Sequence, residues 1–206
     1  MNPIKQLAGE TAVYGLSSIV PKFLNYLLVP LYTRIFIPEV YGIVTEMYAY
    51  VTFLIIILTY GMETGFFRFA NTEKDVNKVY GTCFISIITT SLIFAFCVIV
   101  NAQHIANFLH YYHHKEYITW FALILSLDAI TAIPYVRLRQ ENKAFLFAGY
   151  RILSVVLNIG FNIFFLIICR KYFSHHPDSV FSFLYSKKIG VGYVFISNLL
   201  ANIINF

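Results

Sequence analysis

Charged residues are scarce in this chain. They make up 12% of its 206 residues, whereas hydrophobic residues make up 59%. A soluble domain carries roughly 25% charged residues, so this chain has too little polar surface to cover a soluble globule. The low charge predicts an integral membrane protein, for which the lipid bilayer is the main solvent.

Other absences narrow the function. The net charge is +5, but no block of basic residues marks a nucleic-acid partner. The three cysteines (Cys83, Cys97 and Cys169) lie in apolar runs and form no metal or disulfide pattern, so we interpret them as packing residues. No GxSxG motif occurs, and no histidine lies within a predicted membrane segment to act as a base. A membrane-embedded enzyme, such as an intramembrane protease or a lipid-sugar transferase, is therefore only an alternative hypothesis.

Histidines cluster in two loops. His110, His113 and His114 resemble a metal-binding group, and His175-His176 form a second pair. The first group is surrounded by aromatic residues such as Tyr111 and Trp120, which gather at membrane interfaces. We therefore expect interface residues here and no bound metal.

Long apolar runs dominate the chain. A membrane-spanning helix needs about 20 apolar residues, and polar connections separate six runs of this kind. We predict an all-α, polytopic bundle of about six transmembrane helices, in one unit of residues 1–206. The segments run approximately over 11–36, 41–69, 79–103, 117–138, 144–169 and 189–206.

Two prolines lie in the first segment, and a glycine pair lies in the second. Pro21 and Pro30 lie inside the first and should kink it, because each removes a backbone donor. Gly61 and Gly65 have the GxxxG spacing that lets two helix backbones approach closely. By itself this motif is weak, and Glu63 inside it carries more functional meaning.

The distribution of lysine and arginine indicates the orientation in the membrane. Basic residues are enriched in short cytoplasmic loops, and here they favour the side of the N-terminus once the long last loop is set aside. We therefore expect a cytoplasmic N-terminus. The basic residues on that side are Lys5, Arg68, Lys74, Lys78, Arg137, Arg139, Lys143 and Arg151, against Arg34 and Lys115 on the other.

The sequence stops at Phe206, inside the sixth apolar run and without a polar tail. We expect from this a chain that continues into a further, C-terminal part.

Several ionisable residues lie at membrane depth. Each costs roughly 2.5–3.5 kcal/mol near a helix centre on insertion scales, so such residues usually face a bundle interior or a cavity. One interpretation is a hydrated cavity with cations for an anionic substrate. The alternatives are a structural Lys22–Asp128 ion pair, or arginines that only reach toward the interface. The candidate cavity residues are Lys22, Asn25, Glu63, Arg68, Asp128, Arg151 and Asn158.

Milder polar residues recur at three- or four-residue spacing, which places each set on one helix face. Hydrogen bonds between helices or a cavity lining would both explain them. The three sets are Arg151, Ser154, Asn158 and Asn162; Asn198 and Asn202; and Thr82, Ser86 and Thr90.

Two stretches carry a family resemblance. Residues 23–34 (FLNYLLVPLYTR), followed by Tyr41-Gly42, and residues 60–69 (YGMETGFFRF) resemble the first two helices of bacterial polysaccharide flippases of the O-antigen and capsule (Wzx) type. These flippases share the multidrug/oligosaccharidyl-lipid/polysaccharide exporter superfamily with the MurJ-type lipid II flippases and the MATE drug exporters. Pro134 and Arg137-Leu138-Arg139 in the fourth segment fit the same pattern.

The resemblance implies one six-helix lobe, the N-terminal half, of a two-lobe transporter in the bacterial inner membrane. Its substrate would be a polyprenyl-pyrophosphate-linked oligosaccharide, moved for surface polysaccharide synthesis. Lys22 and Glu63 match cavity-lining positions by motif, and Arg68 matches less closely. No cofactor is implied beyond a coupling proton or sodium ion. A lipid II flippase, a MATE-type exporter and a purely structural subunit are the alternatives.

Overall fold

The first predicted segment folds as two helices in the structure, a computed structural model that describes residues 3–175, 185–186 and 189–206. Helix α1 (Pro3–Tyr26) is followed after Leu27 by α2 (Leu28–Ile35). Pro30 lies in the first turn of α2 and has no N–H to donate to the carbonyl of Tyr26, which explains an interruption at this point. Pro21 is accommodated inside α1.

The second predicted segment is also divided, although 41–69 was expected to form one helix. Helix α3 (Pro38–Thr59) ends and α4 (Met62–Thr72) begins around Tyr60 and Gly61, both of which have left-handed backbone with φ of 34° and 73°. Left-handed residues cannot continue a right-handed helix. Glu63 therefore lies in the first turn of a new helix.

The remaining segments follow the expected order. Asp75 caps α5 (Val76–Val100) by accepting from the backbone N–H groups of Asn77 and Lys78. The short α6 (Ala102–Phe108) and the long α7 (Lys115–Gln140) come next. Helix α8 (Ala144–Ile163) continues through a π-helical stretch, η1 (Phe164–Cys169), into α9 (Arg170–His175), and α10 (Gly192–Asn205) closes the described chain.

Four of these units are long and apolar enough to cross a membrane. They span Pro38–Thr72, Val76–Val100, Lys115–Gln140 and Ala144–Tyr172. Helix α10 has 14 residues, about 21 Å at 1.5 Å per residue, which is shorter than a hydrocarbon core of ~30 Å. Large apolar side chains such as Phe53, Phe96 and Phe145 are 70–82% exposed. In a polytopic all-α membrane protein, such side chains face lipid.

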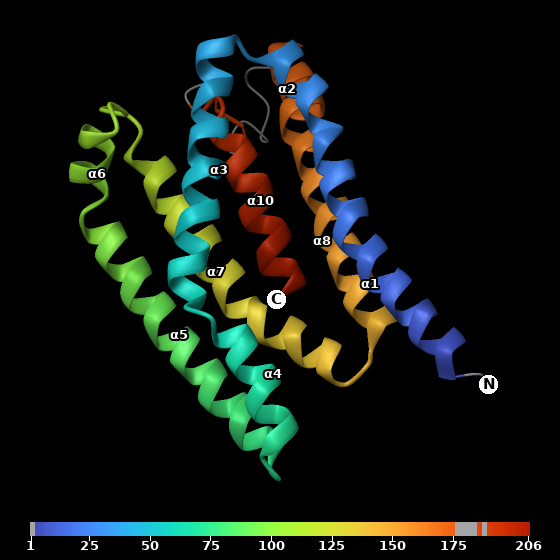
Figure 1. The fold of residues 1–206 in the computed structure, drawn as a ribbon. Coiled ribbons are helices and arrows are strands. Elements are labelled where there is room, and N and C mark those ends of the chain that lie inside the picture. The colour runs from blue at the N-terminus through green and yellow to red at the C-terminus, as the bar shows by residue number, and fades with distance from the viewer. Residues whose placement is uncertain (1–2, 176–184, 187–188) are drawn as a thin grey trace.

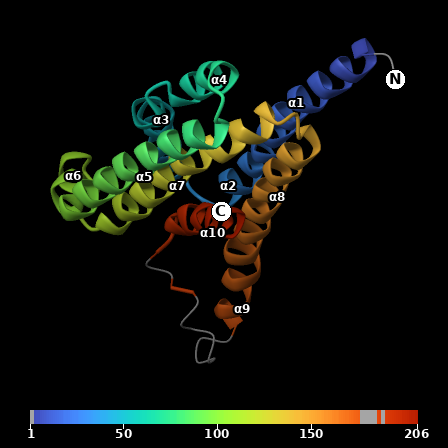
Figure 2. The same ribbon diagram turned by 90° about the horizontal axis from the view of Figure 1, so that it is seen from below.

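The helices form two groups with α10 between them. Figure 1 shows α1 and α8 side by side, and α3, α5 and α7 together on the other side. Figure 2, seen from below, shows α10 between α7 and α8, and α10 packs against both. Helix α7 supplies much of the core, with Leu125 and Ile133 fully buried.

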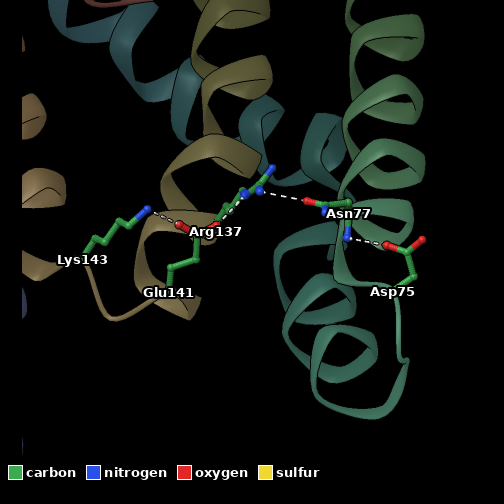
Figure 3. Close-up of polar contacts among 5 residues, drawn as sticks. All are labelled: Asp75, Asn77, Arg137, Glu141 and Lys143. Carbon is green, nitrogen blue, oxygen red and sulfur yellow. Dashed lines mark hydrogen bonds and ion pairs between the residues drawn. The ribbon is translucent and has the colours of Figure 1, made fainter.

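A polar cluster joins α5 to α7 at the end of the bundle where the α7–α8 connection lies (Figure 3). Arg137 donates from Nε to Glu141 (2.7 Å) and from a terminal nitrogen to Asn77 Oδ1 (2.9 Å), and it lies 4.5 Å from the ring centre of Tyr80. Lys143 Nζ donates to the other oxygen of Glu141 (2.6 Å). Lys143 and Arg137 together hold the pKa of Glu141 below its usual range.

Candidate functional site

A cavity of about 690 Å³ lies between the two helix groups. Helices α1 and α8 line one side, α3, α4 and α7 line the other, and α10 contributes one row of side chains. Many of these side chains are polar, although several of the helices are apolar enough to span a membrane. Polar groups concentrated at membrane depth indicate a water-filled chamber, because unpaired polar atoms in lipid are costly.

Six of the seven candidate residues line this cavity. Helix α1 places Lys22 and Asn25 there, α8 places Arg151 and Asn158, α4 places Glu63, and α7 places Asp128.

Arg68 is the exception, since it is exposed and lies outside the lining. It follows Glu63 by five residues, which turns it about 140° away from Glu63 around the helix axis. Arg139 of α7 lines the cavity instead.

Three cations, Lys22, Arg139 and Arg151, therefore face the chamber, and none of them forms an ion pair among the described residues. Arg151 lies near enough to Asp128 to interact with its charge. The guanidinium of Arg151 lies 4.6 Å from the ring centre of Tyr135. The guanidinium of Arg139 lies 5.4 Å from the ring centre of Phe67. Aromatic rings of this kind hold a cation in place without neutralising it.

Two carboxylates complete the charged lining. Asp128 accepts a hydrogen bond from Asn202 Nδ2 (2.8 Å), and no ion pair joins it to Lys22 among the described residues. The structural Lys22–Asp128 pair, one of the interpretations of the sequence, is therefore absent from this arrangement. Glu63 is half-buried and has no described hydrogen-bond partner.

A chain of amides fixes the side formed by α1 and α8. Asn162 is fully buried and donates to the backbone carbonyl (2.8 Å) and to Oδ1 (3.0 Å) of Asn158. Asn162 Oδ1 accepts from the hydroxyl of Tyr32 (2.9 Å). Asn158 Nδ2 then donates to Asn25 Oδ1 (3.3 Å). The chain ties α2, α8 and α1 together and ends at the cavity.

A row of asparagines on α10 faces the other side. Asn198 Nδ2 donates to the hydroxyl of Tyr48 (2.7 Å), and Asn205 Nδ2 donates to the hydroxyl of Tyr135 (2.7 Å). Together with Asn202, these residues line the cavity. The polar stripes on α8 and α10 thus combine hydrogen bonds between helices with a cavity lining.

The polar residues of α5, Thr82, Ser86 and Thr90, only form hydrogen bonds within their own helix or to a neighbouring one. Thr82 and Thr90 donate to carbonyls of their own helix, and Ser86 bonds to the hydroxyl of Tyr60. None of the three lines the cavity formed by the described residues.

The loop histidines stack on aromatic rings. His110 lies 5.8 Å from Tyr112 and His114 lies 4.6 Å from Tyr117, measured between ring centres. No group of three potential metal ligands occurs among the residues described. The side chains of His175 and His176 lie outside the described part of the structure.

Three further lining residues, Tyr135, Arg139 and Asn205, were not among the predicted cavity residues, although the sequence contains a signal for them. Asp128, Tyr135 and Arg139 follow one another at spacings of seven and four, and Asn205 continues the row of Asn198 and Asn202. Residues at such spacings share one face of a helix.

Comparison with known families matches residues 31–204 to the family described as "Polysaccharide biosynthesis protein". The match covers most of the chain, including five of the six predicted segments in whole or large part. The chain belongs to the polysaccharide biosynthesis protein family. Its place in this family supports a role in polysaccharide biosynthesis or export. The family and the membrane helices point to a transporter-like protein rather than to a catalytic enzyme. Searches among curated proteins and among solved structures found no match.

Proposed function

We propose that this protein is a flippase that moves a polyprenyl-pyrophosphate-linked oligosaccharide across the bacterial inner membrane for surface polysaccharide synthesis. One observation carries the proposal: a member of the polysaccharide biosynthesis protein family has a polar cavity among its apolar helices, and three cations that form no described ion pair line this cavity. Fixed cations attract a pyrophosphate more strongly in such a site than in water, because the surroundings screen charge less.

Each part of the substrate has a matching environment. The pyrophosphate lies near Lys22 and Arg151, and the amides offer hydrogen bonds to sugar hydroxyls. The polyprenyl tail stays in the bilayer beside the exposed apolar side chains. Glu63 or Asp128 binds the coupling proton or sodium ion, and a C-terminal lobe rocks against this one to expose the cavity to each side in turn. The N-terminus lies in the cytoplasm.

Single substitutions in the full-length protein test the role of the cavity. We expect Lys22→Ala, Glu63→Ala and Arg151→Ala to abolish export of surface polysaccharide in a deletion strain at unchanged protein level. Arg68→Ala is the matched control, because it removes a cation from a neighbouring membrane helix but not from the cavity. Normal complementation by the three cavity variants would refute the proposal.

The deletion phenotype separates the related functions. Loss of surface polysaccharide with intact growth supports the proposed substrate. Lysis from failed cell-wall synthesis would indicate a lipid II flippase, and drug sensitivity alone would indicate a MATE-type exporter.

A further inference from the structure

The hydrogen bonds around the cavity give its two sides opposite character. On the side of α1 and α8, the backbone carbonyl of Asn158 can only accept, so Asn162 must point its amide nitrogen toward it. The same nitrogen also reaches Asn158 Oδ1, which leaves Asn158 Nδ2 to donate to Asn25 Oδ1. Asn25 therefore presents its N–H groups to the cavity.

Lys22, Asn25 and Arg151 thus form a donor wall. All three side chains are exposed to the chamber and offer N–H groups. A phosphate group has only acceptor oxygens and fits this wall.

The opposite side offers acceptors. The carboxylate of Asp128 accepts a hydrogen bond from Nδ2 of Asn202. The side-chain carbonyl oxygen of Asn202 is therefore left to accept hydrogen bonds in the cavity. The second carboxylate oxygen of Asp128 has no described partner, and Glu63 brings two further acceptor oxygens from α4. We call Glu63, Asp128 and Asn202 the acceptor wall.

The charge balance limits what can bind there. Lys22, Arg139 and Arg151 oppose the two carboxylates, which leaves the lining with a small formal excess of positive charge. A pyrophosphate consumes that excess. The occupied cavity then has no net positive charge left, and a further anionic group on the sugar would face Glu63 and Asp128. Like charges at short range in a poorly screened site repel.

We propose that the acceptor wall selects neutral, hydroxyl-rich sugars and rejects acidic sugars next to the pyrophosphate. Sugar hydroxyls donate to Glu63, Asp128 and Asn202, while the phosphates stay on the donor wall. The inference rests on the proposed function and adds to it the chemical class of the glycan.

The test compares two probes on the full-length protein in lipid nanodiscs. One is a polyprenyl-diphosphate-linked disaccharide of neutral sugars, and the other is the same lipid with a uronic acid as its second sugar. Competition against a labelled neutral probe gives both affinities. We expect the wild type to prefer the neutral probe by on the order of tenfold.

Three variants and a control separate the two walls. Glu63→Gln removes a charge from a side chain with no described partner, so folding is not at risk. It should raise the affinity for the acidic probe relative to that for the neutral probe severalfold, because the like charge that repels the acidic sugar is gone. Asp128→Asn should act in the same direction. Arg151→Gln should weaken both probes by a similar factor, and the control, Arg68→Gln, should change neither.

The outcomes distinguish the two proposals. Equal affinities of the wild type for both probes, or an unchanged ratio in Glu63→Gln and Asp128→Asn, would overturn the sugar selectivity. If Arg151→Gln still weakened both probes in that case, the flippase proposal would stand. Unaltered binding in Arg151→Gln would instead contradict the phosphate site on which both proposals depend.

Discussion

The hydroxyl of Tyr60 lies 2.6 Å from Oγ of Ser86, so the residue that breaks the second membrane segment is bonded to α5. Tyrosine rarely adopts left-handed backbone, and here a contact from another helix accompanies that conformation. Because of the break, α4 runs in a different direction from α3, and its side chains are turned differently about the helix axis. Through it, Glu63 faces the cavity from the first turn of α4.

Gly61→Ala tests this break. Gly61 has φ of +73°, and a Cβ added there would meet open space, so the cost of alanine is torsional rather than steric. We expect the free energy of unfolding to fall by about 1 kcal/mol. Gly65→Ala is the control, because Gly65 also has open space but ordinary helical backbone, where alanine is favoured by up to about 1 kcal/mol. Thermal unfolding in detergent measures both, and equal melting temperatures for the two variants would contradict the assignment of strain to Gly61.

Tyr32→Phe tests the amide chain. Tyr32 is 7% exposed and its hydroxyl is the donor to the fully buried Asn162. Removing that hydroxyl leaves a buried carbonyl oxygen without its partner, which should cost about 1–3 kcal/mol of stability. Tyr41→Phe is the matched control, because its ring lies 6.1 Å from that of Tyr32 but its hydroxyl has no described hydrogen bond. If both variants lose the same stability in thermal unfolding, the amide chain has no special role.

The sequence predicted the helices better than their interruptions. Helices occupy the six predicted apolar runs, and four of these units are long and apolar enough to cross a membrane. The rarity of charge in the runs pointed to Lys22, Glu63, Asp128 and Arg151, which line the cavity. The break at Tyr60 and Gly61 was not predicted, because Gly61 was interpreted as part of a helix-packing motif and no local signal places a tyrosine in left-handed backbone.

Which polar residues face inward was harder to predict from the sequence. Arg68 and Arg139 both lie near one end of a membrane segment, and only helix rotation separates them. The orientation of the asparagines depends on partners more than 100 residues away, such as Asn25 for Asn158. Helix periodicity carries no information about such pairings.

Glu141 makes the α5–α7 cluster sensitive to acid. Its pKa is lowered in the folded protein by Lys143 and Arg137, so its contribution to stability is present above the ordinary glutamate pKa of about 4.3 and is lost as the pH falls below it. We expect Glu141→Gln to lower the melting temperature at pH 7, and the difference from wild type to shrink as the pH falls below about 4.3 toward the lowered pKa of Glu141 in the folded protein. The loss should stay below about 1 kcal/mol because the cluster is partly solvated.

Glu73→Gln controls for the removal of one carboxylate, because Glu73 is exposed and has no described side-chain partner. A pH-independent gap between wild type and Glu141→Gln would show that the two cations do not supply the stabilisation.

Water must reach the cavity if sugars and phosphates pass through it. We expect Lys22→Cys and Glu63→Cys to react rapidly with a water-soluble thiol reagent, in a background where the three native cysteines are replaced. Ile87→Cys, at a fully buried position, should react slowly because no solvent reaches it. Phe96→Cys is the sharper control, since its position is 70% exposed but faces lipid, where a polar reagent does not dissolve. If Lys22→Cys is labelled as slowly as Ile87→Cys, water does not reach the space between the two helix groups. Transport through this cavity would then be excluded, whereas the helical architecture would be unaffected.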